Sequence, residues 1–133
     1  MTPNTSERTD RHMTDARILI VDDEPIVREA IHDWLVDAGY SVTTARTGEE
    51  ALEIVAQQDF GLVILDVRLP GKTGIRVLQE MKEMKPDIRA IIITAYASPD
   101  MHTEATKLGA MHYLTKPIAP DQLEKLVQDA LSN

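Results

Sequence analysis

The fold is decided by residues 18–25, which read ILIVDDEP. The first four are aliphatic without a polar interruption, which indicates a β-strand covered on both faces. Pro25 suits the first turn of a helix, where its missing N–H is not needed. A buried strand that passes through three acidic residues into a helix is typical of an α/β domain with a parallel sheet.

The same alternation of apolar runs and amphipathic stretches is repeated along the chain. Strands are predicted over 18–21, 40–45, 62–65, 88–94 and 111–115. Helices are predicted to begin near Pro25, Thr47, Gly74, Ser98 and Pro120. Each crossover between parallel strands must return over the sheet, so the pattern predicts a five-stranded sheet with helices on both faces.

Some details of the helices are also predicted. Ile26 is expected on the buried face of the first helix, as are Val27, Ala30, Ile31, Trp34, Leu35 and Ala38. Met84 is expected to pack in the core with Leu78 and Met81. Thr47 and Glu50 have the spacing of a capping box, in which each side chain bonds the other residue's backbone N–H.

Composition narrows the class of protein. The chain has 133 residues, 43% of them hydrophobic and 27% charged, which predicts one globular domain. Residues 1–15 are polar and predicted to be a flexible leader, with the folded domain over 16–133. The net charge of −8 argues against direct nucleic-acid binding. Cysteine is absent, which excludes disulfides and thiolate sites. No membrane span or secretory signal is visible, so a cytoplasmic location is expected.

The chemistry is expected where the strands end. In an open parallel sheet, functional groups collect at the carboxyl edge. The predicted strands end in residues 22–24 (Asp-Asp-Glu), Asp66, Thr94 and Lys116. Clustered carboxylates need a cation, and hard oxygen ligands in an open loop suit Mg²⁺. Asp66 is the best-placed nucleophile for a phosphoryl group, with Lys116 and Thr94 contributing a positive charge and a hydrogen-bond donor.

The pattern of motifs resembles the receiver domain of two-component response regulators. The resemblance runs from about Ala16 to about Leu131, in the right order and spacing. It rests on Asp22-Asp23, on Asp66 followed by Pro70 and Gly74, on Thr94-Ala95, and on Tyr113-Leu114-Thr115-Lys116-Pro117. The fold that this resemblance implies is flavodoxin-like, (βα)₅, with strand order 2-1-3-4-5.

The resemblance also implies a function and a set of roles. Asp66 would be phosphorylated by the phosphohistidine of a sensor kinase or phosphotransfer protein. Mg²⁺ would be ligated directly by Asp23, Asp66 and the backbone carbonyl of Arg68, and through water by Asp22. The Lys116–Pro117 peptide bond resembles the family's cis bond.

The same resemblance implies a switch. Lys116 would contact the phosphoryl group, and Thr94 would move toward it. Tyr113 would then swing inward and change the surface formed by the fourth helix, the fifth strand and the fifth helix. That surface would control an output domain or partner, and a phosphorylation-dependent homodimer through it is a further expectation. The domain is expected to be a switch and not an enzyme, beyond its own phosphotransfer and dephosphorylation.

The sequence departs from the common pattern in two places, and two further residues bear on the lifetime of the phosphorylated form. Residues 71–74 read Gly-Lys-Thr-Gly, where the family often has an acidic residue before the second glycine, and Ile118 replaces a frequent Phe. Arg68 and Tyr96 are bulky at positions that the family links to the rate of dephosphorylation. They predict a long-lived phosphorylated form, because both could hinder an attacking water.

The sequence also bears on four other functions. A nucleotide-binding loop at 71–73 fails because Asp66 stands where the motif needs a glycine. A haloacid-dehalogenase-type phosphatase would carry its nucleophile after the first strand. A flavin carrier would have a phosphate loop rich in Ser, Thr and Gly. A degenerate receiver that acts only as an interaction module is the remaining alternative, which intact Asp66, Thr94 and Lys116 disfavour.

Overall fold

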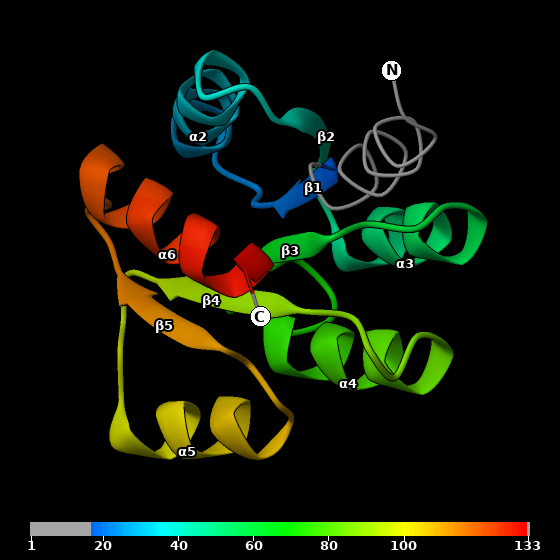
Figure 1. Ribbon diagram of the computed structural model, residues 1–133. Coiled ribbons are helices and arrows are strands. Elements are labelled where there is room, and N and C mark those ends of the chain that lie inside the picture. The colour runs from blue at the N-terminus through cyan, green and yellow to red at the C-terminus, as the bar shows by residue number, and fades with distance from the viewer. Residues whose placement is uncertain (1–16, 133) are drawn as a thin grey trace.

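The computed structural model describes residues 17–132, so the predicted leader over 1–15 lies outside the described residues. It contains a parallel five-stranded sheet in the order β2-β1-β3-β4-β5, as predicted (Figure 1). The strands are β1 (Arg17–Val21), β2 (Ser41–Ala45), β3 (Leu62–Asp66), β4 (Ala90–Thr94) and β5 (His112–Thr115). The helices are α2 (Pro25–Asp37), α3 (Gly48–Gln57), α4 (Gly74–Met84), α5 (Pro99–Lys107) and α6 (Pro120–Ser132).

The helices cover the two faces of the sheet unequally. Helices α2 and α6 lie on one face, and α3, α4 and α5 lie on the other (Figure 1). The three central strands are buried on both faces, which explains their uninterrupted aliphatic runs. Alternate residues of each strand therefore belong to different cores: Ile18, Ile64 and Ile91 pack with α2 and α6, whereas Leu19, Val63 and Ile92 pack on the opposite side.

Parallel register brings the strand ends to one edge. Val21 is paired with Leu65, one residue before Asp66, and Thr94 is paired with Thr115. The residue that follows β1 therefore lies beside the last residue of β3, and the residue that follows β5 lies at the same edge, with β4 between β5 and β3. The sheet thus places Asp22, Asp66 and Lys116 at one edge although they are far apart in the sequence.

Three residues that were predicted to be buried on helices are exposed in the structure. Ile26 is 84% exposed, because it lies about 100° around the helix from Val27, which does pack against the core. Ala38 is exposed because it caps the helix C-terminus, where the chain turns away. Met84 is 41% exposed because it is the last residue of α4.

The capping box is only half formed. The Thr47 hydroxyl accepts a hydrogen bond from the Glu50 backbone N–H at 3.1 Å, as predicted. The Glu50 carboxylate instead accepts from the Arg46 backbone N–H at 2.7 Å, one residue before the cap. The N-terminus of α3 is still capped, with a donor outside the helix satisfied as well. No helix within residues 17–132 is long and apolar enough to cross a membrane.

Candidate functional site

Three carboxylates meet at the carboxyl edge of the sheet. Asp22 and Asp23 follow β1, and Asp66 is the last residue of β3. One carboxylate oxygen from each lies within 4.8 Å of the other two. Asp22 and Asp66 are buried whereas Asp23 is exposed, so the cluster is reached from the solvent on the Asp23 side.

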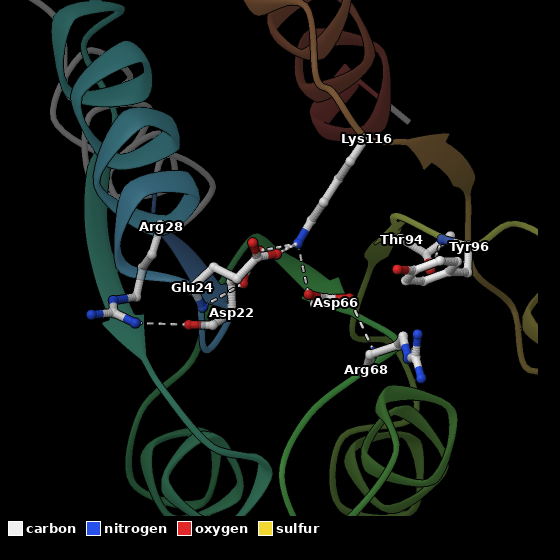
Figure 2. A network of polar contacts seen from close by, with 8 residues as sticks. All are labelled: Asp22, Glu24, Arg28, Asp66, Arg68, Thr94, Tyr96 and Lys116. Carbon is white, nitrogen blue, oxygen red and sulfur yellow. Dashed lines mark hydrogen bonds and ion pairs between the residues drawn. The ribbon is translucent and has the colours of Figure 1, made fainter.

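Lys116 supplies the positive charge that this cluster needs. Its Nζ lies 2.8 Å from Asp66 Oδ2, 3.0 Å from Asp22 Oδ2 and 2.5 Å from Glu24 Oε1 (Figure 2). Burial lowers the pKa of Lys116, but hydrogen bonds to these carboxylates outweigh burial and raise the pKa above its usual value. Lys116 is therefore positively charged at neutral pH. The Lys116–Pro117 peptide bond is cis, as predicted.

The Asp66 carboxylate is held from two sides. Its Oδ1 accepts a hydrogen bond from the Arg68 backbone N–H at 3.0 Å, and its Oδ2 accepts from Lys116. Both contacts fix the plane of the carboxylate at the end of a fully buried strand. An oriented carboxylate beside a cation is suited to attack an electrophile such as a phosphorus atom.

Asp22 is the most constrained of the carboxylates. Burial raises its pKa above the usual value, with the Glu24 backbone N–H and the Lys116 cation acting in the opposite direction. Its Oδ1 accepts from that Glu24 N–H at 2.9 Å, and its backbone oxygen accepts from Arg28 Nη1 at 2.9 Å. Its Oδ2 is in ionic contact with Lys116, but it has no well-aligned hydrogen-bond donor among the described residues.

These donors fit a hard divalent cation. A buried carboxylate oxygen without a hydrogen bond is a ready ligand position, and Mg²⁺ prefers carboxylate oxygens with room for water. Asp22, Asp23 and Asp66 are close enough together to share one ion. The assignment of Asp23 and Asp66 as direct ligands, of Asp22 as a ligand through water and of the Arg68 carbonyl as a further ligand stays a prediction.

Thr94 and Tyr113 lie on the face of the sheet that α5 covers. Thr94 is buried and its hydroxyl accepts a hydrogen bond from the Tyr96 backbone N–H at 3.1 Å. Tyr113 is paired in register with Ile92, two residues before Thr94, so both side chains are on the face covered by α5. The Tyr113 hydroxyl is buried without a hydrogen-bond partner among the described residues, and its ring meets His102 edge-on.

Arg68 and Tyr96 form a pair beside the pocket. The Arg68 guanidinium lies over the Tyr96 ring, 4.5 Å from its centre (Figure 2). Both residues are exposed. The two bulky residues that were predicted to affect dephosphorylation are thus in contact with each other, which the sequence did not indicate.

Sequence reasoning missed two contributors to the site. The sequence places Glu24 at the acidic end of the first strand without indicating a separate role for it, and it gives Arg28 no role. The contact between Glu24 and Lys116 joins residues 92 positions apart, so no local pattern could reveal it. For Arg28, its place one turn after the acidic run was the available signal, because that spacing points a side chain back along the helix.

The structure is that of a parallel α/β domain with an acidic cluster and a paired lysine at the carboxyl edge of its sheet. The sequence model of the family described as "Response regulator receiver domain" matches residues 18–128. The chain therefore belongs to the receiver domains of the response regulators of two-component signalling. These are phosphorylation-dependent switches and not classical enzymes.

Curated relatives include both small and large proteins. The chain is 38% identical over 119 residues to sporulation initiation phosphotransferase F of Bacillus subtilis, covering 90% of this chain and 96% of that one. It is 40% identical over 120 residues to the transcriptional regulatory protein ZraR of Escherichia coli, covering 87% of this chain but only 26% of that protein. The chain thus spans about a quarter of the large regulator.

Solved structures agree with the fold. A CheY-like receiver domain protein from Methanospirillum hungatei superposes with a TM-score of 0.85 at 31% identity, over 87% of this chain and 93% of that one. The response regulator TrrA from Thermotoga maritima, in complex with Mg²⁺ and BeF, has a TM-score of 0.78 at 37% identity, over 86% and 97%. The beryllofluoride-activated NtrC4 receiver domain dimer has a TM-score of 0.84 at 32% identity, over 88% and 97%.

Proposed function

We propose that Asp66 is the phosphoacceptor, and that a phosphohistidine on a sensor histidine kinase or histidine phosphotransfer protein is the donor. The single observation that supports this most is the geometry of the Asp66 carboxylate. It is 3% exposed, ends the central strand, and is fixed by the Arg68 backbone N–H on one oxygen and by Lys116 on the other.

The transfer proceeds by attack of an Asp66 carboxylate oxygen on phosphorus. The phosphorus–nitrogen bond to the donor imidazole breaks, its electron pair stays on the imidazole nitrogen, and an acyl phosphate forms on Asp66. Lys116 stabilises the negative charge on the phosphoryl oxygens, and the Arg68 N–H orients the attacking carboxylate. Mg²⁺ held by Asp23, Asp66 and the Arg68 carbonyl, with Asp22 acting through water, would supply further positive charge at the phosphoryl oxygens. The acyl phosphate is lost again by hydrolysis within the same pocket.

The signal passes from Thr94 to Tyr113. The Thr94 hydroxyl is a hydrogen-bond donor that can turn toward the new phosphoryl oxygens, which frees space on the α5 side of the sheet. Tyr113 lies on that side, and its buried hydroxyl has no hydrogen-bond partner among the described residues, so no hydrogen bond of this hydroxyl is lost when the side chain moves. Its inward movement alters the surface of α5, β5 and α6, and phosphorylation selects the altered state.

The proposal includes the way in which the altered surface passes on the signal. The α5-β5-α6 surface controls an output domain or partner, or forms a phosphorylation-dependent homodimer. An NtrC4 receiver that is a dimer in its beryllofluoride-activated form supports the second possibility. A cytoplasmic location is part of the same proposal, and this segment is not expected to bind nucleic acid, because its charge is −8.

Intact-mass measurement tests the acceptor directly. The protein is incubated with acetyl phosphate and Mg²⁺, beside an Asp66→Asn variant and a sample containing EDTA. The expected result is a gain of one phosphoryl group that is lost in both controls. If the protein gains none under any condition, with phosphorylated donor protein included, the domain is a phosphorylation-independent interaction module and the proposal fails.

A further inference from the structure

The Lys116 ammonium group is crowded by carboxylates in the structure. An ammonium has three N–H groups. Three carboxylate oxygens, from Asp22, Glu24 and Asp66, lie within 3.0 Å of the nitrogen. The Lys116 side chain is only 9% exposed, so solvent offers it little in exchange. Lys116 can therefore reach a phosphoryl oxygen only if one of the three carboxylates releases it.

Two of the three carboxylates are poorly suited to release the lysine. The Asp22 side chain is fully buried, and both its Oδ1 and its backbone oxygen accept hydrogen bonds from Glu24 and Arg28. Asp66 is the proposed acceptor itself, and the phosphoryl group arrives beside its own bond to Lys116. Moving either carboxylate would dismantle the pocket.

Glu24 is different in each respect. Its side chain is 56% exposed, and it stands at the N-cap of α2. In the cap itself, the Glu24 side chain makes no hydrogen bond to the helix. Its carboxylate can rotate into the solvent at a low cost in free energy, because an exposed carboxylate is well hydrated.

We propose that Glu24 is a positioning residue that holds Lys116 in the unphosphorylated protein and competes with the phosphoryl group for it. The proposal rests on the proposed function, since it assigns Lys116 to the phosphoryl oxygens. The phosphoryl group gains Lys116 when Glu24 turns outward. Glu24 thereby lowers the affinity of the pocket for phosphoryl groups and keeps the unmodified lysine ordered.

The negative charge of Glu24 also lowers the affinity of the site for a phosphoryl group. The pocket holds Asp22, Asp23 and Asp66 with Lys116, and Glu24 adds one more carboxylate beside the lysine. An incoming phosphoryl group is itself negative, so a carboxylate at this position opposes it. Glu24→Gln removes the charge while keeping nearly the same shape.

The first measurement is the affinity for beryllofluoride, a phosphoryl analogue, at saturating Mg²⁺, with the Mg²⁺ affinity measured separately for each variant. Glu24→Gln is expected to bind beryllofluoride roughly twofold to fivefold more tightly than the wild type, the range that an exposed ion pair contributes. Glu29→Gln is the matched control, because it removes the same charge from an exposed position further along α2. It is expected to match the wild type.

The second measurement is the NMR signal of the Lys116 amino group in the metal-free protein. Three carboxylate contacts should slow exchange of its protons with water, so the signal is expected in the wild type and in Glu29→Gln, and weakened in Glu24→Gln. An identical signal in Glu24→Gln and the wild type overturns the proposal, as does an unchanged or weaker beryllofluoride affinity in Glu24→Gln. If the wild type itself binds no beryllofluoride, the proposed function fails, and the competition fails with it.

Discussion

At the scale of single residues, burial of the Asp22 carboxylate lowers the stability of the folded protein when that carboxylate is ionised. Burial raises the pKa of Asp22, so the folded protein holds that proton more tightly than the unfolded chain does. Ionised Asp22 therefore costs stability above its folded-state pKa, and this cost disappears as the pH falls through that pKa. Nearby Asp66 adds like-charge repulsion. The ionised carboxylate at position 22 is therefore a cost to folding in the absence of a bound cation.

Asp22→Asn is expected to raise the free energy of unfolding without Mg²⁺ by roughly 1 kcal/mol, because the asparagine carries no charge to bury. The gain should be largest near neutral pH and fade in acid, where Asp22 of the wild type becomes protonated. Urea unfolding at several pH values measures both effects. Asp37→Asn, at an exposed position, should change stability by less than about 0.5 kcal/mol. A loss of stability in Asp22→Asn at neutral pH would contradict the account.

The contact between Arg68 and Tyr96 leads to a prediction about the lifetime of the phosphorylated form. A guanidinium over an exposed ring is worth about 0.5–1 kcal/mol, enough to keep both side chains near the pocket mouth. Arg68→Ala and Tyr96→Ala should each speed the loss of phosphate, and the double variant by roughly tenfold, or about 1.4 kcal/mol of barrier. The decay of phosphoprotein after removal of the donor measures this.

The two effects should not be additive. Removing either partner frees the other, so the double variant should decay less fast than the product of the single effects predicts. Lys107→Ala, on exposed α5 surface, serves as a control with unchanged decay. Equal decay rates in the wild type and the double variant would show that these side chains do not restrict water.

At the scale of elements, α4 packs directly on the strand that carries the acceptor. Gly74 opens this helix, and its backbone N–H donates to Val67 O at 2.7 Å. A Cβ on Gly74 would lie 2.1 Å from the Asp66 backbone oxygen and 2.7 Å from Val67 Cα. Neither neighbour is a flexible side chain, so only hydrogen fits between the helix and the strand.

Gly74→Ala is accordingly expected to destabilise the fold by roughly 2–4 kcal/mol, because either α4 or the end of β3 has to move. Gly39→Ala is the comparison: it has a left-handed backbone with φ +100° but open space around it, so about 1 kcal/mol is expected. Thermal unfolding of both variants tests the ranking. If Gly74→Ala costs no more than Gly39→Ala, the packing argument is wrong.

Elements also show what the sequence could predict. The strands follow from aliphatic runs and helical crossovers, and the strand ends locate Asp66 and Lys116 without a structure. The order of the strands follows from the resemblance to receiver domains. Exposure at helix ends was not predictable in this way: Ile26 and Met84 fit apolar spacing but lie off or beyond the packed face. The Glu24 contact was also out of reach, since it depends on how β1 and β5 align across the sheet.

At the scale of the whole molecule, the residues at the carboxyl edge of the sheet belong to both of its faces. Asp22 and Asp66 lie at the ends of strands whose preceding alternate residues, Ile20 and Ile64, pack with α2 and α6. Thr94 and Tyr113 belong to the face of α3, α4 and α5. A change in charge at the edge can therefore alter packing on the α5 side without disturbing the opposite core.

The same arrangement predicts that a divalent cation stabilises the whole fold. An ion that binds only the folded pocket stabilises the entire domain by mass action, by about 2.7 kcal/mol at a concentration one hundred times its Kd. Mg²⁺ is thus expected to raise the melting temperature in a saturable way, whereas NaCl at equal ionic strength should not. Asp23→Asn should abolish most of this increase, because Asp23 contributes an exposed oxygen to the cluster and is not part of the core. Differential scanning calorimetry over a Mg²⁺ titration measures the effect. An equal increase with NaCl, or an undiminished one in Asp23→Asn, would mean that the three carboxylates do not form the metal site.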